Sequence, residues 1–133
     1  MEVKIIPVVC AIIEQDGLVL CALRSERMSL PGKWEFPGGK LEVNELPEEA
    51  LIREIKEELN IEIKIIEALP IAEHAYVPEK IIQLIPYRCV IVSDEIPTPT
   101  EHSELRWMKK DELPQLDWAA ADIPIVLNYI QTK

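Results

Sequence analysis

The sequence has no long apolar run, few cysteines and a shortage of basic residues. No stretch approaches the ~20 consecutive apolar residues of a membrane-spanning helix, and residues 1–4 lack the features of a signal peptide. We therefore expect a cytoplasmic protein with no membrane partner. Its three cysteines are widely spaced among apolar residues, which predicts small buried thiols rather than a disulfide framework or a zinc site.

Basic residues are outnumbered, with 14 lysines and arginines against 24 aspartates and glutamates, for a formal net charge of −10. Proteins hold a phosphate backbone by neutralising it with basic side chains, so this balance argues against a large nucleic-acid partner. Half of the excess lies in residues 45–62, where seven acidic and two basic residues give a net charge of −5. Such a cluster is either a solvated helix face or a cation site.

The apolar pattern predicts strands interleaved with two helices. Runs rich in β-branched residues predict strands at residues 3–13, 18–23, 33–36, 61–71, 80–92 and 105–108. The first two are joined by Asp16-Gly17, which is typical of a hairpin turn. Helical spacing of apolar residues predicts helices at residues 47–59 and 120–129. Because 133 residues suffice for one core, we expect a single domain over residues 1–133 with an α/β sandwich fold around a mixed sheet.

Prolines and glycines predict where these elements stop. Pro37, Gly38 and Gly39 should end the third strand, and residues 93–100 should form a loop. A loop containing His74 and Pro78 is expected between the strands at 61–71 and 80–92. Pro86, inside the latter run, indicates a bulge or an edge position.

Three carboxylates share one face of the helix predicted at residues 47–59. At about 100° per residue, Glu54, Glu57 and Glu58 fall within an arc of roughly 100° beside the apolar stripe. Like charges three and four residues apart repel one another, so a compensating charge is expected. A magnesium ion bound through these oxygens would supply it. The spacing alone leaves a solvated acidic face open as the alternative.

A longer pattern begins at Gly39. After five residues comes Glu45, and after seven more comes Arg53-Glu54-Ile55-Lys56-Glu57-Glu58-Leu59-Asn60-Ile61. This closely resembles the Nudix box, and only Asn60 departs from it, because the family has glycine there. Asparagine tolerates left-handed dihedrals, so we still expect the helix to end at Asn60.

Segments on both sides of the box extend the resemblance over nearly the whole chain. They include Leu23-Arg24, residues 32–40, the stretch from Glu101-His102 to Trp107, and residues 121–124. They resemble the MutT-like branch of the Nudix hydrolases, particularly its CTP pyrophosphohydrolases. The resemblance implies the Nudix-type α/β/α sandwich.

The resemblance also implies a metal site for Mg²⁺, with Mn²⁺ as a possible substitute. The implied metal ligands are Glu54, Glu57, Glu58, the carbonyl of Gly38 and a distal acid, Glu101. Glu54 matches a residue that binds the metal or a metal-held water and can act as general base, and the nearby Glu104 stays open as an alternative to Glu101. Arg53 and Glu45 match a pair that orients the catalytic helix.

Substrate contacts are implied at five positions: Arg24 and Lys40 for phosphate or nucleotide, and Glu35, Phe36 and Asp122 for the base. The structural alternatives are surface cations for Arg24 and Lys40, a core side chain for Phe36 and a helix N-cap for Asp122. A carboxylate such as that of Asp122 can accept a hydrogen bond from the exocyclic amine of cytosine. His74 either borders the pocket or faces solvent.

The implied partner is therefore a small nucleotide. The resemblance implies hydrolysis of a nucleoside triphosphate to the monophosphate and pyrophosphate, with CTP, dCTP or a modified cytosine nucleotide preferred. Alternatives are an enzyme that sanitises 8-oxo-dGTP, a hydrolase of diphosphate sugars or dinucleoside polyphosphates, and an inactive nucleotide-binding module. An inactive module would be expected to lack one of Glu54, Glu57 and Glu58, and all three are present. Both a monomer and a homodimer are compatible with the sequence.

Overall fold

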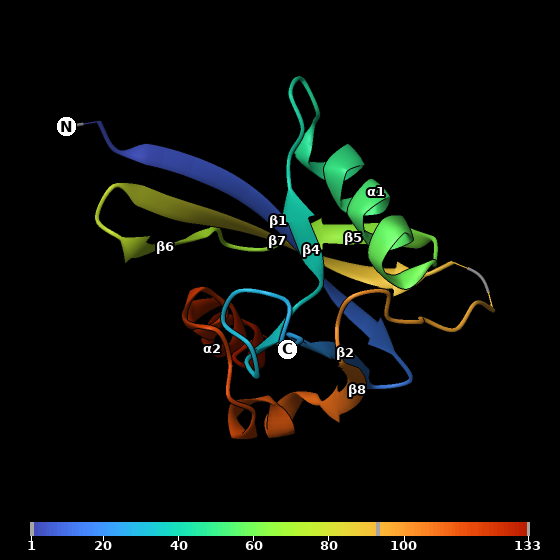
Figure 1. Ribbon diagram of the computed structural model, residues 1–133. Coiled ribbons are helices and arrows are strands. Elements are labelled where there is room, and N and C mark those ends of the chain that lie inside the picture. The colour runs from blue at the N-terminus through green and yellow to red at the C-terminus, as the bar shows by residue number, and fades with distance from the viewer. Residues whose placement is uncertain (1, 93, 133) are drawn as a thin grey trace.

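The computed structural model describes residues 2–92 and 94–132 (Figure 1). Its strands are β1 (Lys4–Gln15), β2 (Leu18–Leu23), β3 (Trp34–Glu35), β4 (Gly38–Lys40), β5 (Ile63–Ala68), β6 (Ala72–Val77), β7 (Lys80–Ile91) and β8 (Glu104–Lys109). Helix α1 (Pro47–Leu59) follows β4, and two 3₁₀ helices, η1 (Lys110–Gln115) and η2 (Ala120–Asp122), precede α2 (Ile123–Ile130). No helix in the described ranges is long and apolar enough to cross a membrane.

The sheet is mixed because β1 and β7 run parallel, whereas the other strand pairs are antiparallel. β4 pairs with the edge of β1 that faces away from β7. β5 and β6 both pair with the edge of β7 that faces away from β1. β2 leaves β1 through Asp16 and Gly17, whose positive φ angles of 53° and 78° suit a tight hairpin turn. β2 then pairs with β3 and β8, which form the second part of the sheet.

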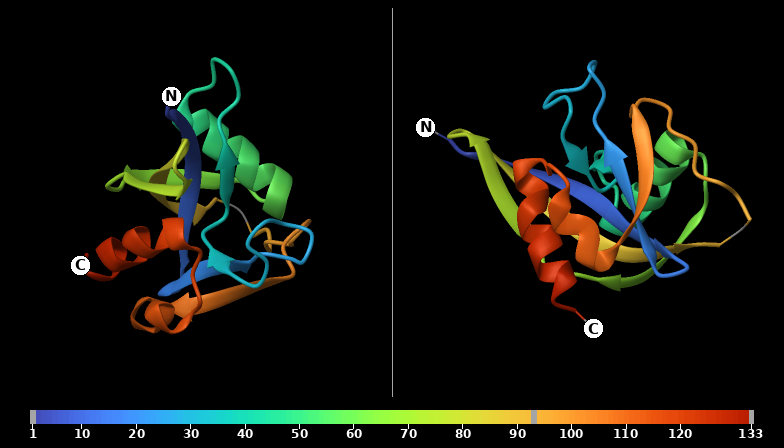
Figure 2. Two further views of the ribbon diagram at one scale, coloured as in Figure 1. Left: turned by 60° about the vertical axis from the view of Figure 1, so that its left-hand side comes forward. Right: turned by 90° about the horizontal axis from the view of Figure 1, so that it is seen from below.

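β1 is buried on both faces over its central residues. Val9 and Ile13 pack in the layer of α1, whereas Cys10 and Ile12 pack in the layer of α2. Successive side chains of a strand point to opposite faces, so a run of apolar residues without alternation requires a cover on each side. The two helices supply it from opposite faces, which gives the predicted α/β/α sandwich (Figure 2).

Several sequence predictions are confirmed in detail. The first helix covers residues 47–59, and it ends at Asn60 in the left-handed conformation, with φ 57° and ψ 39°. The Asn60 N–H donates to the carbonyl of Lys56. The three cysteine thiols are buried. The second helix begins later than predicted, because residues 120–122 form a 3₁₀ turn before α2.

Other predictions need correction. The segment expected to be a loop around His74 forms β6, and the glycines expected only to end a strand form β4. Pro86 does not lie in an edge strand, since β7 has neighbours on both sides. The ladders of β7 with β5 and β6 do contain register shifts, but these fall between Ile65 and Glu67 and between His74 and Val77, not at Pro86. The carbonyl of Pro86 accepts from the N–H of Leu69, at the junction between β5 and β6. The donor that proline lacks therefore faces this junction and costs no ladder hydrogen bond. Ser93, part of the predicted loop, lies outside the described residues.

Candidate active site

A cavity of about 740 Å³ lies beside α1 and β4. Ten predicted site residues line it: Arg24, Glu35, Phe36, Gly38, Lys40, Glu54, Glu57, Glu58, Glu101 and Asp122. Their positions span almost 100 residues of sequence, so the fold rather than local spacing brings them together. Glu45 and Arg53 are not part of the cavity wall.

The two glycines of β4 allow the backbone to approach its neighbours closely. A Cβ atom on Gly38 would overlap the carbonyl oxygen of Val9 in β1, and one on Gly39 would overlap the carboxylate of Glu54 in α1. No other residue fits at either position without movement. Glycine at position 39 therefore lets the carboxylate of Glu54 lie directly against the strand.

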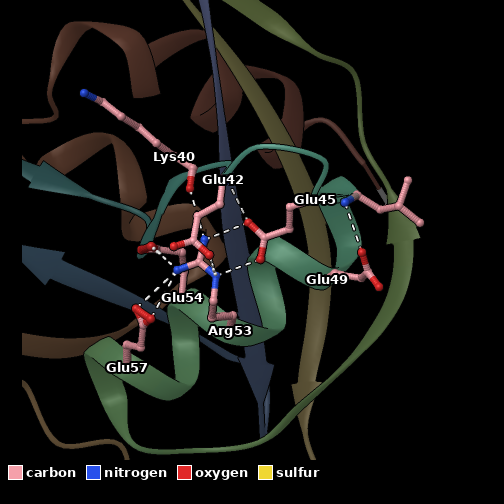
Figure 3. Close-up of polar contacts among 8 residues, drawn as sticks. Lys40, Glu42, Glu45, Glu49, Arg53, Glu54 and Glu57 are labelled. Carbon is pink, nitrogen blue, oxygen red and sulfur yellow. Dashed lines mark hydrogen bonds and ion pairs between the residues drawn. The ribbon is translucent and has the colours of Figure 1, made fainter.

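Arg53 is the centre of an ion-pair network on α1 (Figure 3). Its Nε donates to Glu45 Oε2 at 2.7 Å, and its Nη2 donates to Glu45 Oε1 at 2.8 Å. Its Nη1 donates to Glu54 Oε1 at 2.9 Å and to both oxygens of Glu57 at 3.2 Å. Nη2 also donates to the carbonyl of Lys40. One guanidinium thus ties the loop before α1, strand β4 and two helix carboxylates together.

Glu45, which pairs with Arg53 from the loop before α1, is held in its ionised form. The side-chain hydrogen bond from Arg53 and the backbone N–H of Glu42 lower the pKa of Glu45 to about 2. Two-point contact between a guanidinium and a carboxylate fixes orientation as well as charge. The geometry agrees with the helix-orienting pair that the sequence resemblance implies.

Glu58 lies in a strongly acidic and buried environment. Burial, followed by the negative charges of Glu35, Glu54 and Glu101, raises the pKa of Glu58 to about 9, against the effect of a backbone hydrogen bond from Gly38. Within the described residues, Oε2 of Glu58 is buried and has no hydrogen-bond partner. A charged carboxylate buried among other acids is costly unless a proton or a metal cation neutralises it. These residues therefore fit a hard divalent cation such as magnesium, which prefers oxygen ligands.

The carboxylates are not gathered around a common point. Among the residues that the structure describes, no group of three acidic, histidine or cysteine side chains could hold a metal ion as it stands. Arg53 explains this, because it binds the carboxylates of Glu54 and Glu57. Burial also raises the pKa of Glu54, and the hydrogen bond from Arg53 opposes that shift. A cation would have to compete with Arg53 for these two side chains.

The two candidate distal acids differ in their surroundings. Glu101 is exposed, lines the cavity and contributes to the raised pKa of Glu58. Glu104 lies in β8 and accepts hydrogen bonds from Arg106 at 2.8 and 3.1 Å. Of the two, only Glu101 is among the residues that line the cavity.

A buried acid on η2, Asp122, also lines the cavity. Asp122 Oδ2 accepts a hydrogen bond from the backbone N–H of Phe36 at 3.0 Å. Burial is the main cause that raises the pKa of Asp122 to about 8. Asp122 also occupies the N-cap position of α2, as the alternative expected, but its side chain makes no capping hydrogen bond there. Phe36 belongs to the core and also to the cavity wall, with its ring 4.7 Å from that of Trp118.

Glu35 lies between two donors. Arg24 Nη1 donates to Glu35 Oε1 at 2.6 Å, and Nε2 of the buried His102 lies 2.7 Å from Glu35 Oε2. Arg24 also donates to the hydroxyl of Ser29 and to its carbonyl. The guanidinium of Arg24 is therefore engaged within the protein, whereas the ammonium group of Lys40 points away from the Arg53 network (Figure 3).

Sequence reasoning missed several residues of this region. Tyr76 lines the cavity, and its hydroxyl accepts from the N–H of Ala121 at 2.9 Å. Its strand was expected to be a loop, so no signal pointed to it. His74 packs edge-on against Tyr76 but is not among the residues that line the cavity. His102 was noted only within the family resemblance, and its partner Glu35 lies 67 residues away in the sequence.

Comparison with known proteins gives matches over nearly the whole chain. CTP pyrophosphohydrolase from Escherichia coli K12 is 39% identical over 131 residues, which cover 98% of this chain and 95% of that protein. Nucleoside triphosphatase NudI from an E. coli O17:K52:H18 strain is 32% identical over 121 residues, which cover 83% of this chain and 86% of that protein. The solution structure of a MutT protein from methicillin-resistant Staphylococcus aureus 252 is 48% identical, covers 98% of this chain and 97% of its own, and gives a TM-score of 0.77.

The family pattern itself extends well beyond the acidic helix. The NUDIX domain model matches residues 4–129, from the start of β1 to the last turn of α2. This range includes the whole sheet and both helices that cover it. The chain therefore belongs to the NUDIX family of hydrolases.

Proposed function

We propose that this nucleotide hydrolase converts a nucleoside triphosphate to the monophosphate and pyrophosphate with Mg²⁺, and that CTP, dCTP or a modified cytosine nucleotide is preferred. One observation carries the proposal: the buried, unpartnered Glu58 oxygen lies in the same cavity as the buried carboxylate of Asp122. A nucleotide is polyanionic at one end and carries hydrogen-bonding base edges at the other. A cavity lined both by a group suited to a cation and by a second buried acid suits such a molecule.

The proposed metal ligands are the carboxylates of Glu54, Glu57, Glu58 and Glu101 and the carbonyl of Gly38. A bound divalent cation lowers the pKa of water and neutralises phosphate oxygens. A bound cation would offset the cost of burial and the repulsion from neighbouring acids, which together raise the pKa of Glu58. Mn²⁺ has the same preference for oxygen ligands and is expected to substitute.

The chain's own residues orient the reaction and move the proton. Glu45 and Arg53 hold α1 against β4, so that the helix carboxylates face the cavity. Glu54 takes the proton of the attacking water, because burial raises its pKa and makes it a better base than an exposed carboxylate. Lys40 neutralises phosphate oxygens at the cavity wall. Arg24 shapes the wall near the nucleotide through its bonds to Ser29 and Glu35.

The part of the cavity wall around Asp122 is proposed to bind the base. Asp122 is fixed by the N–H of Phe36, and it can face the exocyclic amine of cytosine. Glu35 and Phe36 line the same wall. A relative named CTP pyrophosphohydrolase supports cytosine as the preferred base. The similarity to a MutT protein favours a second candidate, hydrolysis of oxidised purine triphosphates such as 8-oxo-dGTP.

A nucleotide panel tests the proposal. CTP, dCTP, UTP, dGTP and 8-oxo-dGTP are compared by kcat/KM with Mg²⁺, for the wild type and for Asp122→Asn. We expect CTP or dCTP to lead and Asp122→Asn to reduce that preference by about 10-fold, since one base contact is worth about 1–3 kcal/mol. If 8-oxo-dGTP leads, the second candidate replaces the first. An equal loss with every base would remove Asp122 from base recognition.

A further inference from the structure

The loop formed by residues 98–103 is fixed on both sides of Glu101. On one side, the N–H and the hydroxyl of Thr100 both donate to the carbonyl of Glu58, at 3.2 and 3.1 Å. On the other side, His102 Nε2 lies 2.7 Å from Glu35. Glu101 itself is exposed at the cavity wall between these two anchors.

Further backbone contacts strengthen each anchor. The N–H of Thr98 donates to the carbonyl of Leu59, and the N–H of Ser103 donates to the carbonyl of Leu23, both at 3.0 Å. The loop therefore joins the C-terminal end of α1 to the end of β2 (Figure 1). Thr100 and Glu101 are exposed and line the cavity, whereas the His102 side chain is buried.

The side chains of Thr100 and His102 each form a hydrogen bond that holds the loop in place. Glu35 accepts from Arg24 on its other oxygen, and a carboxylate can only accept, so the Nε2–H of His102 is the donor. The His102 ring is buried, which excludes alternative positions in solvent. The Thr100 hydroxyl meets a carbonyl at the end of α1, where helix carbonyls lack intrahelical donors.

We propose that Thr100 and His102 are positioning residues that hold Glu101 opposite Glu58 for cation binding. This inference rests on the proposed metal site. Glu58 and Glu101 line the same cavity, which supports the facing arrangement of the two carboxylates. A rival explanation is that the same hydrogen bonds only cap α1 and stabilise the fold.

A double-mutant cycle separates these explanations, with Mn²⁺ alone as the probe and no nucleotide present. Free Mn²⁺ is measured by electron paramagnetic resonance with the full chain. Thr100→Val removes the hydroxyl at nearly constant shape, whereas Thr100→Ser retains it. His102→Leu removes the donor, whereas His102→Gln retains a donor at a comparable distance. Each variant is made in the wild type and in Glu101→Gln.

Thr100→Val and His102→Leu should each weaken Mn²⁺ binding by about 5-fold, as expected for one lost hydrogen bond. Thr100→Ser and His102→Gln should stay near the wild type. In Glu101→Gln the same changes should have almost no further effect, because they act through Glu101. Melting temperatures are recorded in parallel. Where His102→Leu fails to fold, the Thr100 pair alone completes the cycle.

Two results would overturn the inference. One is a Thr100→Val protein that melts earlier but binds Mn²⁺ like the wild type, since that is a purely structural effect. The other is an equal loss of affinity with and without the Glu101 carboxylate. Glu57→Gln separates this failure from that of the proposed function: if Glu57→Gln also binds Mn²⁺ normally, the metal site itself is wrong.

Discussion

Gly39 lies so close to Glu54 that a Cβ atom on the glycine would overlap the carboxylate. Its neighbour Gly38 has an equally close contact, but with the backbone of Val9 and Cys10. The Glu54 side chain beside Gly39 can move, whereas the backbone beside Gly38 is part of the sheet. The two glycines should therefore respond differently to the same substitution.

Gly39→Ala should impair activity more than stability. We expect it to displace Glu54, lower kcat by about 10- to 100-fold and reduce the free energy of unfolding by less than about 1 kcal/mol. Gly38→Ala is the matched control, and it should reduce the free energy of unfolding by about 2 kcal/mol or more through the backbone clash. Urea unfolding and steady-state kinetics check both. Equal losses of stability would contradict the difference in packing.

Arg53→Lys tests the two-point pairing with Glu45. Lysine keeps the charge but cannot form a fork with both carboxylate oxygens. We expect kcat to fall by at least about 10-fold, because α1 loses its fixed orientation. Arg88→Lys is the control, since Arg88 also bridges two acids, Glu14 and Glu67, away from the cavity. Similar kinetics for both variants would show that the pairing of Arg53 has no special role.

Magnesium should stabilise the protein by a saturable amount. A ligand that binds only the native state raises stability by RT ln(1 + [L]/Kd), so the melting temperature should rise with Mg²⁺ beyond a sodium chloride control of equal ionic strength. Glu57→Gln should lose this effect and lower turnover by about 100-fold or more. Glu48→Gln, a change at an exposed acid in the first turn of α1, should keep both. Identical melting shifts with the two salts would favour a solvated acidic face.

Asp122 should make stability depend on pH. Its pKa is raised from 3.8 to about 8 in the folded protein, so between these values the native state holds a proton that the unfolded chain has lost. The contribution of Asp122 is therefore fully present below about pH 4 and declines as pH rises toward 8, by at most about 1.4 kcal/mol per pH unit.

The measurement is urea unfolding in EDTA at pH 5 and pH 8. The wild type should lose stability relative to Asp122→Asn as pH rises across this interval. Asp117→Asn, a change at an exposed aspartate paired with Lys33, should follow the wild type. A constant difference between the wild type and Asp122→Asn would mean that Asp122 does not titrate in this window.

Local signals explain which parts of the fold could be predicted. The apolar spacing of α1, the proline at its first position and the Asp16-Gly17 turn are all encoded by neighbouring residues, and these elements are confirmed. β6 has several exposed residues and no clear alternation, and it exists because it pairs with β7. β4 likewise depends on pairing with β1. Such long-range pairing leaves little trace in local sequence.

Local signals also explain which residues of the cavity could be predicted. The acidic helix face was visible from spacing alone, since Glu54, Glu57 and Glu58 recur at helical intervals. The bond between His102 and Glu35 joins segments that no local pattern connects. The sharing of Arg53 among several carboxylates also depends on their three-dimensional positions. A sequence can indicate which groups are present more easily than how they divide their hydrogen bonds.

The most direct test of the proposed hydrolysis is the identity of the products formed from CTP with Mg²⁺. Ion-exchange chromatography of a reaction followed to partial completion separates mono-, di- and triphosphate nucleotides, and pyrophosphate and phosphate are assayed independently. We expect CMP and pyrophosphate in equal amounts, formed at most about one hundredth as fast with Glu57→Gln at the same enzyme concentration. Formation of CDP and phosphate, or the absence of turnover with CTP and every other nucleoside triphosphate, would contradict the proposed hydrolysis.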